Sequence, residues 1–188
     1  MDTVTILSQP PPRRPGLTRE ALESTPDDGY RYELIDGELL VTPAPGYRHQ
    51  RASGRLFTLL DRHCPPGLVV LSAPFAVGLA ADTEVQPDLL VAPREAFTDK
   101  DLPGAPLLAV ELLSPTTRRA DLELKWERFQ RAGVASYWVV DPAEPGPHLT
   151  AWDLVGGVYE LSAEVGPGDT WTATLPFRVA ITPGNLVD

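Results

Sequence analysis

The segment 107–113 constrains the fold of this chain more than any other, because it places one acid inside an apolar run. Its sequence is LLAVELL, and Glu111 is its only polar residue. A short apolar run of this kind is typical of a strand that is buried on both faces of a sheet. A carboxylate there costs several kcal/mol unless a cation or donor compensates it. Glu111 is therefore either a structural residue, paired with an arginine or capping a backbone group, or part of a functional site.

The remaining pattern predicts an α/β (α+β) sandwich, with a mixed central β-sheet flanked by helices. Asp36-Gly37 accepts the positive φ angles of a two-residue turn and predicts an N-terminal β-hairpin. The C-terminal part predicts antiparallel strands. The expected helices are 18–23, 48–63 and 119–132, and the expected strands are 32–35, 38–41, 68–79, 87–92, 107–113 and 136–141, with two or three more within 148–175.

The length of 188 residues suits one domain, which we place at 17–188. Residues 1–16 are rich in proline and predict a flexible N-terminal arm. They lack the order of a signal peptide, and no apolar run is long enough to span a bilayer. The single cysteine, Cys64, allows no internal disulfide. We therefore expect a cytoplasmic protein with no membrane contact.

The net charge of −10 disfavours nucleic-acid binding, which usually needs a basic surface. Two effects limit this objection. Exposed charges are screened beyond about 8 Å at physiological salt, and a bound divalent cation reverses the local sign. The acidity therefore leaves a nucleic-acid substrate open.

A second acid, Asp88, opens the apolar segment that follows Pro87. Taken alone, it is more typical of a strand-start residue that faces solvent. Together with Glu111, however, it gives two β-segments that each present one acid from an apolar run. Oxygen ligands of this kind suit a hard cation such as Mg²⁺, so the pair predicts a metal site.

The helix expected at 119–132 carries Asp121, Lys125 and Arg128 on one stripe. The opposite, inward stripe consists of Leu122, Trp126 and Phe129. A lysine four residues after an aspartate is most often a solvated surface pair, and this is the default interpretation of Lys125.

The order of these segments resembles the Uma2 family of restriction-endonuclease-like proteins, once catalogued as a domain of unknown function. The resemblance covers about residues 17–160, and its specificity lies in the ordered set of motifs. It implies a PD-(D/E)XK nuclease core, in which an Asp and a strand Glu bind Mg²⁺ and a nearby Lys assists the attacking water. The motifs that carry it are 32–38 (YELIDGE), His49, Pro87-Asp88, 110–115 (VELLSP), Lys125, 132–134 (AGV) and 137–141 (YWVVD).

By this resemblance, Asp88 and Glu111 match the two metal-binding acids. The superfamily places its Lys two positions after the Glu, where this chain has Leu113. The resemblance suggests that Lys125 supplies the ammonium instead, because a long side chain can reach the same point from another element. If it does not, metal binding can survive while catalysis is lost.

A further acid is expected from the N-terminal part, with Glu38 as first choice and Glu33 as second; either can also be an ordinary hairpin charge. His49 has lower weight, because a polar residue at a helix start can serve in capping. Arg118 and Arg119 are candidates for phosphate contact, since guanidinium matches phosphate oxygens. They are equally well explained as solvated loop charges.

The sequence therefore predicts a Mg²⁺-dependent endonuclease, with Mn²⁺ as a substitute, that hydrolyses DNA phosphodiester bonds at Asp88, Glu111, Lys125 and Glu38. Two alternatives stay open. One is an inactive nuclease-fold protein that acts as a binding or assembly module, which Leu113 and the acidic surface favour. The other is a metal-dependent hydrolase of a small substrate. A homodimer is also expected, because nucleases of this fold often pair to cut both strands.

Overall fold

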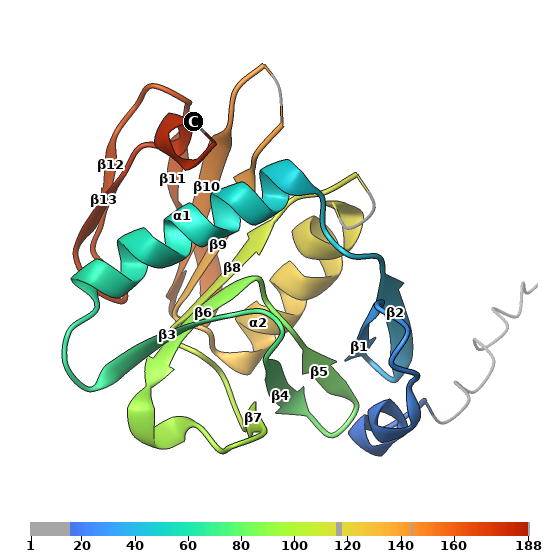
Figure 1. The fold of residues 1–188 in the computed structure, drawn as a ribbon. Coiled ribbons are helices and arrows are strands. Elements are labelled where there is room, and N and C mark those ends of the chain that lie inside the picture. The colour runs from blue at the N-terminus through green and yellow to red at the C-terminus, as the bar shows by residue number, and fades with distance from the viewer. Residues whose placement is uncertain (1–15, 116–117, 144, 188) are drawn as a thin grey trace, which may run out of the picture.

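The centre of the structure is a six-stranded mixed sheet in which the segment around Glu111 is an inner strand (Figure 1). This computed structural model describes residues 16–115, 118–143 and 145–187; the predicted arm lies outside these ranges except for Gly16. β8 is parallel to β9 and antiparallel to β6, which confirms the expected mixed sheet. The sheet order is β11-β10-β9-β8-β6-β3, with β3 (Leu68–Ser72), β6 (Leu89–Pro93), β8 (Leu108–Leu112), β9 (Ser136–Asp141), β10 (His148–Val155) and β11 (Val158–Val165).

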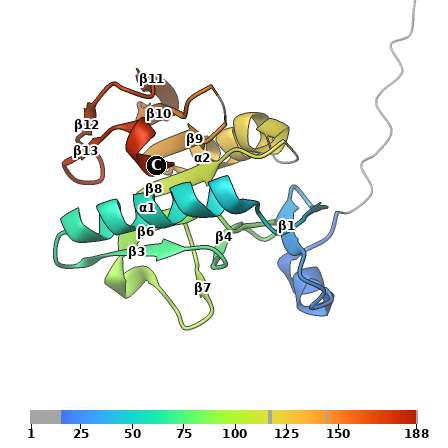
Figure 2. The ribbon, with the colours of Figure 1, turned by 45° about the horizontal axis from the view of Figure 1, so that its top comes forward.

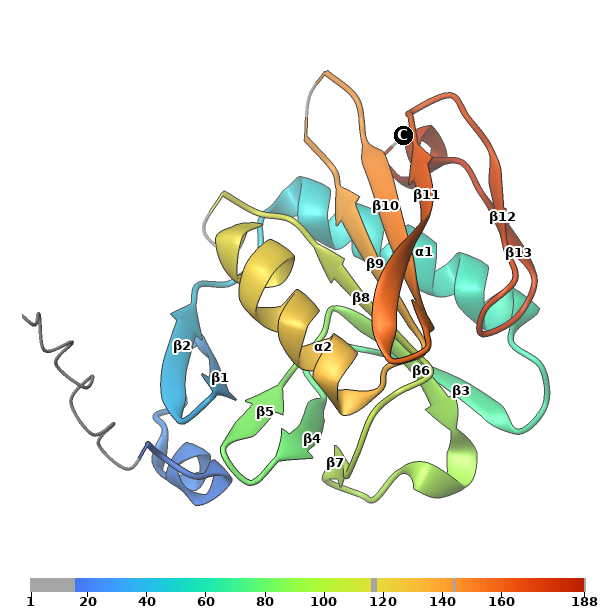
Figure 3. The same cartoon turned by 180° about the vertical axis from the view of Figure 1, so that it is seen from behind.

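Helices cover the two faces of this sheet. α1 (Tyr47–His63) lies on one face, and α2 (Trp126–Ala132) lies on the other, as the views from the front and from behind show (Figures 1 and 3). α2 continues a π-helical segment, Ala120–Lys125, and ends at Gly133, whose φ of 86° lets the chain turn out of the helix. The predicted helix–sheet–helix sandwich is therefore confirmed.

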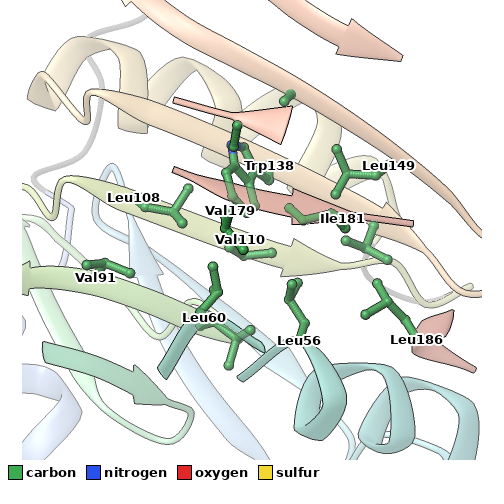
Figure 4. Close-up of a cluster of buried hydrophobic side chains, with 14 of the residues drawn as sticks. Leu56, Leu60, Val91, Leu108, Val110, Trp138, Leu149, Val179, Ile181 and Leu186 are labelled. Atoms are coloured by element: carbon green, nitrogen blue, oxygen red, sulfur yellow. The ribbon is translucent and has the colours of Figure 1, made fainter. Parts of the chain in front are cut away.

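The core under α1 forms because apolar side chains recur at helical spacing. Leu56 and Leu60 are fully buried and belong to the same cluster as Val110 and Trp138 of the sheet. Figure 4 shows them pointing towards Val110, with Val179 and other residues of the C-terminal segment close by. This packing holds α1, and hence its first turn, against the sheet.

A second sheet is built on the predicted hairpin. β1 and β2 pair through all five residues, and Asp36 and Gly37 have φ angles of 55° and 76°, which confirms the two-residue turn. The order of this sheet is β2-β1-β5-β4-β7, with β1 (Arg31–Ile35), β2 (Glu38–Thr42), β4 (Ala76–Ala80), β5 (Thr83–Val85) and β7 (Asp101–Leu102).

Three expected elements differ in detail. The strand expected at 68–79 is two strands, β3 and β4, which belong to different sheets. The break falls at Pro74, which has no N–H for a ladder. The helix expected at 18–23 is a 3₁₀ helix, and Thr18 makes no side-chain cap bond. The C-terminal tail adds a separate two-stranded sheet, made of β12 (Trp171–Ala173) and β13 (Val179–Ile181). The short 3₁₀ helices of the structure are Arg19–Ser24, Arg94–Ala96 and Pro183–Leu186.

Within the described ranges, no helix combines the length and apolar character needed to cross a bilayer.

We expect Leu56→Ala to lower the free energy of unfolding by about 2–5 kcal/mol, because it empties a fully buried position between α1 and the sheet. Urea unfolding followed by circular dichroism measures the change. Thr58→Ala, at an exposed position of the same helix, is the control and should stay within about 0.5 kcal/mol of the parent protein. Equal losses in both variants would contradict this packing.

Candidate functional site

Asp88 and Glu111 lie on the same face of the central sheet. Side chains alternate along a strand, and Ala109 of β8 and Leu90 of β6 both belong to the core under α2. Glu111 and Asp88, each two positions away, therefore face the same side. The antiparallel register that pairs Leu89 with Val110 also places the two acids opposite one another. The two predicted metal ligands are thus neighbours.

Lys125 joins this pair from the helix. Its Nζ lies 3.0 Å from Glu111 Oε1 and 2.9 Å from Glu33 Oε1, and it lies 3.6 Å from Asp121 Oδ1. The side chain is only 2% exposed. The default interpretation of Lys125 and Asp121 as a solvated surface pair is therefore wrong, and the ammonium does reach Glu111 from another element.

A local change of helix type explains why this pair is buried. The segment Ala120–Lys125 is π-helical, so its side chains do not follow the stripe that α-helical spacing predicts. Ala120, Asp121 and Lys125 are buried, whereas Leu122, expected to point inward, is 37% exposed. Wider turns of this type are frequent at functional sites. In this segment the buried side includes Asp121 and Lys125, and Lys125 meets its carboxylate partners there.

The N-terminal acid in the cluster is Glu33 and not Glu38. Glu33, in the middle of β1, is 1% exposed and accepts a 2.7 Å hydrogen bond from the backbone N–H of Gln86 as well as the ion pair with Lys125. Glu38 directly follows the hairpin turn, is exposed, and is not among the described residues that line the pocket. Glu33, the second choice from the sequence, therefore lies in the cluster, and Glu38, the first choice, does not.

Asp88 is held by three donors. Arg31 Nη1 lies 3.1 Å from one carboxylate oxygen; His49 Nε2 lies 3.0 Å, and the Leu112 N–H 2.8 Å, from the other. Burial alone would raise the pKa of Asp88. The hydrogen bond and charge of His49, the charge of Arg31 and the backbone N–H outweigh burial and lower this pKa below its usual value. Asp88 is therefore a carboxylate at neutral pH.

From its position at a helix start, His49 is expected to serve in capping. The structure gives it a different partner: α1 begins after Gly46 as N-cap, and the imidazole bonds Asp88, which is 39 residues away in the chain. No local pattern predicts a contact at that separation. The only signal in the sequence is the position of His49 in the ordered motif set.

Burial and neighbouring charges also shift the pKa values of the other ionisable groups of the site. Burial raises the pKa of Glu111 well above its usual value; Lys125 opposes this effect, and the nearby carboxylates add to it. Burial alone would lower the pKa of Lys125, but Glu111, Glu33 and Asp121 reverse this and raise it. Lys125 therefore stays an ammonium. Burial also raises the pKa of Tyr137 well above normal, and the nearby charges of Glu111, Asp121, Tyr159 and Asp88 add to this effect.

The site as a whole holds more acidic than permanently basic side chains. Four acids, counting Asp121, surround only two permanent cations, Arg31 and Lys125. Extra positive charge from a divalent cation would balance this excess. The cluster borders a cavity of about 180 Å³, whose lining consists of Arg31, Glu33, Thr42, Pro43, Ala44, Pro45, Gly46, His49, Asp88, Glu111, Ser114, Pro115, Asp121 and Lys125.

The donor chemistry fits a hard cation, since the acids supply only carboxylate oxygens. Within the part of the chain that the structure describes, no three His, Cys, Asp or Glu side chains are arranged to hold a metal ion. The ammonium of Lys125 lies within hydrogen-bond distance of both Glu33 and Glu111, so these two carboxylates already share one cation. The residues suit a metal in type and charge, and Asp88 and Glu111 are the candidates to hold it.

The two arginines proposed for phosphate contact lie in surface ion pairs. Arg118 is 2.6 Å from Asp141, and Arg119 is 3.0 Å from Glu123; their side chains are 56% and 88% exposed. Neither is among the described residues that line the cavity. Their contact with phosphate stays a prediction.

Comparisons with known proteins agree with this architecture. Residues 19–184 match the model of the Uma2 family, described as "Putative restriction endonuclease". The fold is similar to a crystal structure titled "a putative nuclease belonging to DUF820" from Anabaena variabilis, with a TM-score of 0.71 and 16% identity over 91% of this chain and 97% of that chain. At this identity, the likeness shows the fold alone. The search of curated proteins found no match.

We expect Lys125→Met to lower the free energy of unfolding by about 3–5 kcal/mol, because it leaves buried carboxylates without their ammonium. Added Mg²⁺ or Mn²⁺ should then raise the melting temperature of the variant more than that of the parent protein, since a cation can replace the lost charge. Thermal unfolding with and without metal measures both effects.

The control for this prediction is Lys100→Met, which removes the only other lysine of the chain from an exposed position. It should change neither stability nor the response to metal. A Lys125→Met protein as stable as the parent would contradict the role of the ammonium in the cluster.

Proposed function

This chain belongs to the Uma2 family, and from that premise we propose that it is an endonuclease that hydrolyses DNA phosphodiester bonds with Mg²⁺ or Mn²⁺. One observation carries the proposal: Asp88, Glu111 and Lys125, which are far apart in the sequence, meet in one buried cluster beside a cavity. Ionisable groups with perturbed pKa values gathered at a cavity are typical of catalytic sites.

Asp88 and Glu111 would hold the metal. When bound, such a cation polarises a phosphate oxygen and lowers the pKa of a coordinated water. Arg31 and His49 contribute by orienting Asp88, because each donates to a different oxygen of its carboxylate. This arrangement fixes the carboxylate before any substrate enters, which is the condition for electrostatic preorganisation.

Lys125 would stabilise negative charge that develops on the phosphate, and would orient the attacking water. Its raised pKa argues for a donor that keeps its proton and against a general base. The family resemblance implies only that the lysine assists the attacking water, and the buried carboxylate partners favour the role of donor. Removing one such group typically slows a reaction on the order of 10²–10³-fold.

The alternative is an inactive nuclease-fold protein that serves as a binding or assembly module. Two observations favour it: the usual lysine position holds Leu113, which is buried in the apolar core, and Lys125 is engaged by carboxylates. A small-substrate hydrolase remains the third candidate. It would act on model phosphodiesters without affinity for DNA.

Pairing of two copies and a reducing cytoplasm complete the proposal. A homodimer would bring two sites to a duplex, one for each strand. Cys64 is the only cysteine of the chain, and a reducing compartment suits a protein that forms no internal disulfide.

We expect Asp88→Asn and Glu111→Gln to abolish Mg²⁺-dependent nicking of supercoiled plasmid while the circular dichroism spectrum is kept. Both changes preserve side-chain shape and remove a charge that would hold the metal. Each also weakens an ion pair inside the cluster, so the circular dichroism spectrum serves as the check that the fold is kept. Unchanged nicking in both variants would refute the assignment.

We expect Glu33→Gln to reduce nicking on the order of 10²-fold, because it disturbs Lys125, whereas Glu38→Gln should nick like the parent protein. This pair tests the corrected choice of the N-terminal acid, since the two positions lie on the same hairpin.

Calorimetry with Mn²⁺, run beside the nicking assay, separates the candidate functions. Metal binding without nicking supports the binding module.

A further inference from the structure

α1 concentrates positive charge in an otherwise acidic chain. The helix carries Arg48, Arg51, Arg55 and Arg62 and a single acid, Asp61. The rest of the chain then holds 12 basic and 25 acidic side chains, out of 16 and 26 in total. Nucleic acid would be repelled by most of such a surface and attracted to the arginines of α1.

The four arginines form one row along the helix. Their spacing of three, four and seven residues keeps them within an arc of about 60° at 3.6 residues per turn. The row extends over roughly 21 Å, from a rise of about 1.5 Å per residue. Arg48, Arg51 and Arg62 are exposed, and Arg55 is half-buried and donates a 2.9 Å hydrogen bond to the carbonyl of Asn185. We call these four residues the α1 arginine row.

The row begins in the first turn of α1, where two residues of the candidate site also lie. Gly46 and His49, at the start of α1, line the cavity, and His49 bonds Asp88, so Arg48 is the sequence neighbour of a site residue. Figure 2 shows α1 running across the outside of the sheet, with its first turn at the end near β1. The row therefore starts in the same helical turn as His49 and extends along the surface of α1 away from that turn.

The opposite side of α1 offers a competing path. A cleft of about 740 Å³ adjoins the site there, and it shares Arg31 and Asp88 with the smaller cavity. Its lining also includes Asp27 and Glu84. These acids make the cleft less suited to a phosphate backbone than the α1 arginine row on the other side of the helix.

We propose that the α1 arginine row binds the sugar–phosphate backbone of the nucleic acid and directs it into the cavity beside Asp88 and Glu111. This inference rests on the proposed nuclease function. Guanidinium groups match phosphate oxygens in paired hydrogen bonds, and a row of this length spans several phosphates of one strand. Binding of this kind follows the backbone and carries no base preference.

The test is the affinity of the full chain for fluorescein-labelled oligonucleotides, measured by fluorescence anisotropy in EDTA so that cleavage plays no part. Arg51→Gln/Arg62→Gln removes two charges of the row that do not adjoin the cavity. We expect affinity to fall at least about tenfold at 0.1 M salt, and the slope of log K against log salt to lose about two units. Single- and double-stranded DNA and RNA form the separate arms.

Two further variants make the test specific. Arg94→Gln/Arg131→Gln removes the same charge from exposed positions elsewhere and should change affinity less than twofold. Arg51→Lys/Arg62→Lys keeps the charge and should retain most of the affinity and slope. Melting temperatures check that each variant is folded. If the glutamine pair unfolds, the lysine pair still decides the test, because loss of binding in the folded lysine variant would contradict a contact with the phosphate backbone.

Equal losses in the row and control variants would overturn the proposal, because net charge would then explain binding. Unchanged affinity and slope in the row variant, or no binding to any oligonucleotide, would also overturn it. Row-dependent binding together with absent nicking would support the α1 arginine row while refuting the nuclease. Nicking that depends on Asp88 but not on the row would support the nuclease and overturn the proposal for the α1 arginine row.

Discussion

The ion cluster around Lys125 is the interaction on which the rest of this structure depends. It joins β1 of the smaller sheet, β8 of the central sheet and the π-helical segment before α2 through Glu33, Glu111 and Asp121. Buried charges are expensive unless each finds its partner, so the cluster is stable only when all three elements are in place. The site and the docking of the hairpin onto the core therefore depend on the same contacts.

The cluster also explains a local departure from helical pattern. Regular α-helical packing would bury Leu122, but the π-helical segment exposes it and buries Asp121 and Lys125 instead. Exposing Leu122 forgoes the hydrophobic stabilisation of its apolar surface, which is about 25 cal/mol per Å². In return, an ammonium reaches Glu111 although the strand position two residues later holds Leu113.

Charge is divided between two neighbouring regions of the molecule. The cluster has more acids than permanent cations, which suits a metal, whereas α1 has more arginines than acids, which suits phosphate. His49 and Arg48 are adjacent in the sequence and belong to these two regions respectively. This division reconciles a net charge of −10 with a polyanionic substrate, because screening makes the local surface matter more than the sum.

The sequence by itself determined what depends on short-range periodicity: the Asp36-Gly37 hairpin, the helix expected over 48–63 and found as α1, and the inner strand that carries Glu111. It also indicated the pairing of Asp88 with Glu111, because a single acid within an apolar β-segment is a local pattern. Only the tertiary structure decided that Glu33 and not Glu38 joins the cluster, that His49 bonds Asp88, and that Lys125 is buried. Each of these contacts joins residues far apart in the chain or depends on a helix register that packing selects, and neither leaves a local signal.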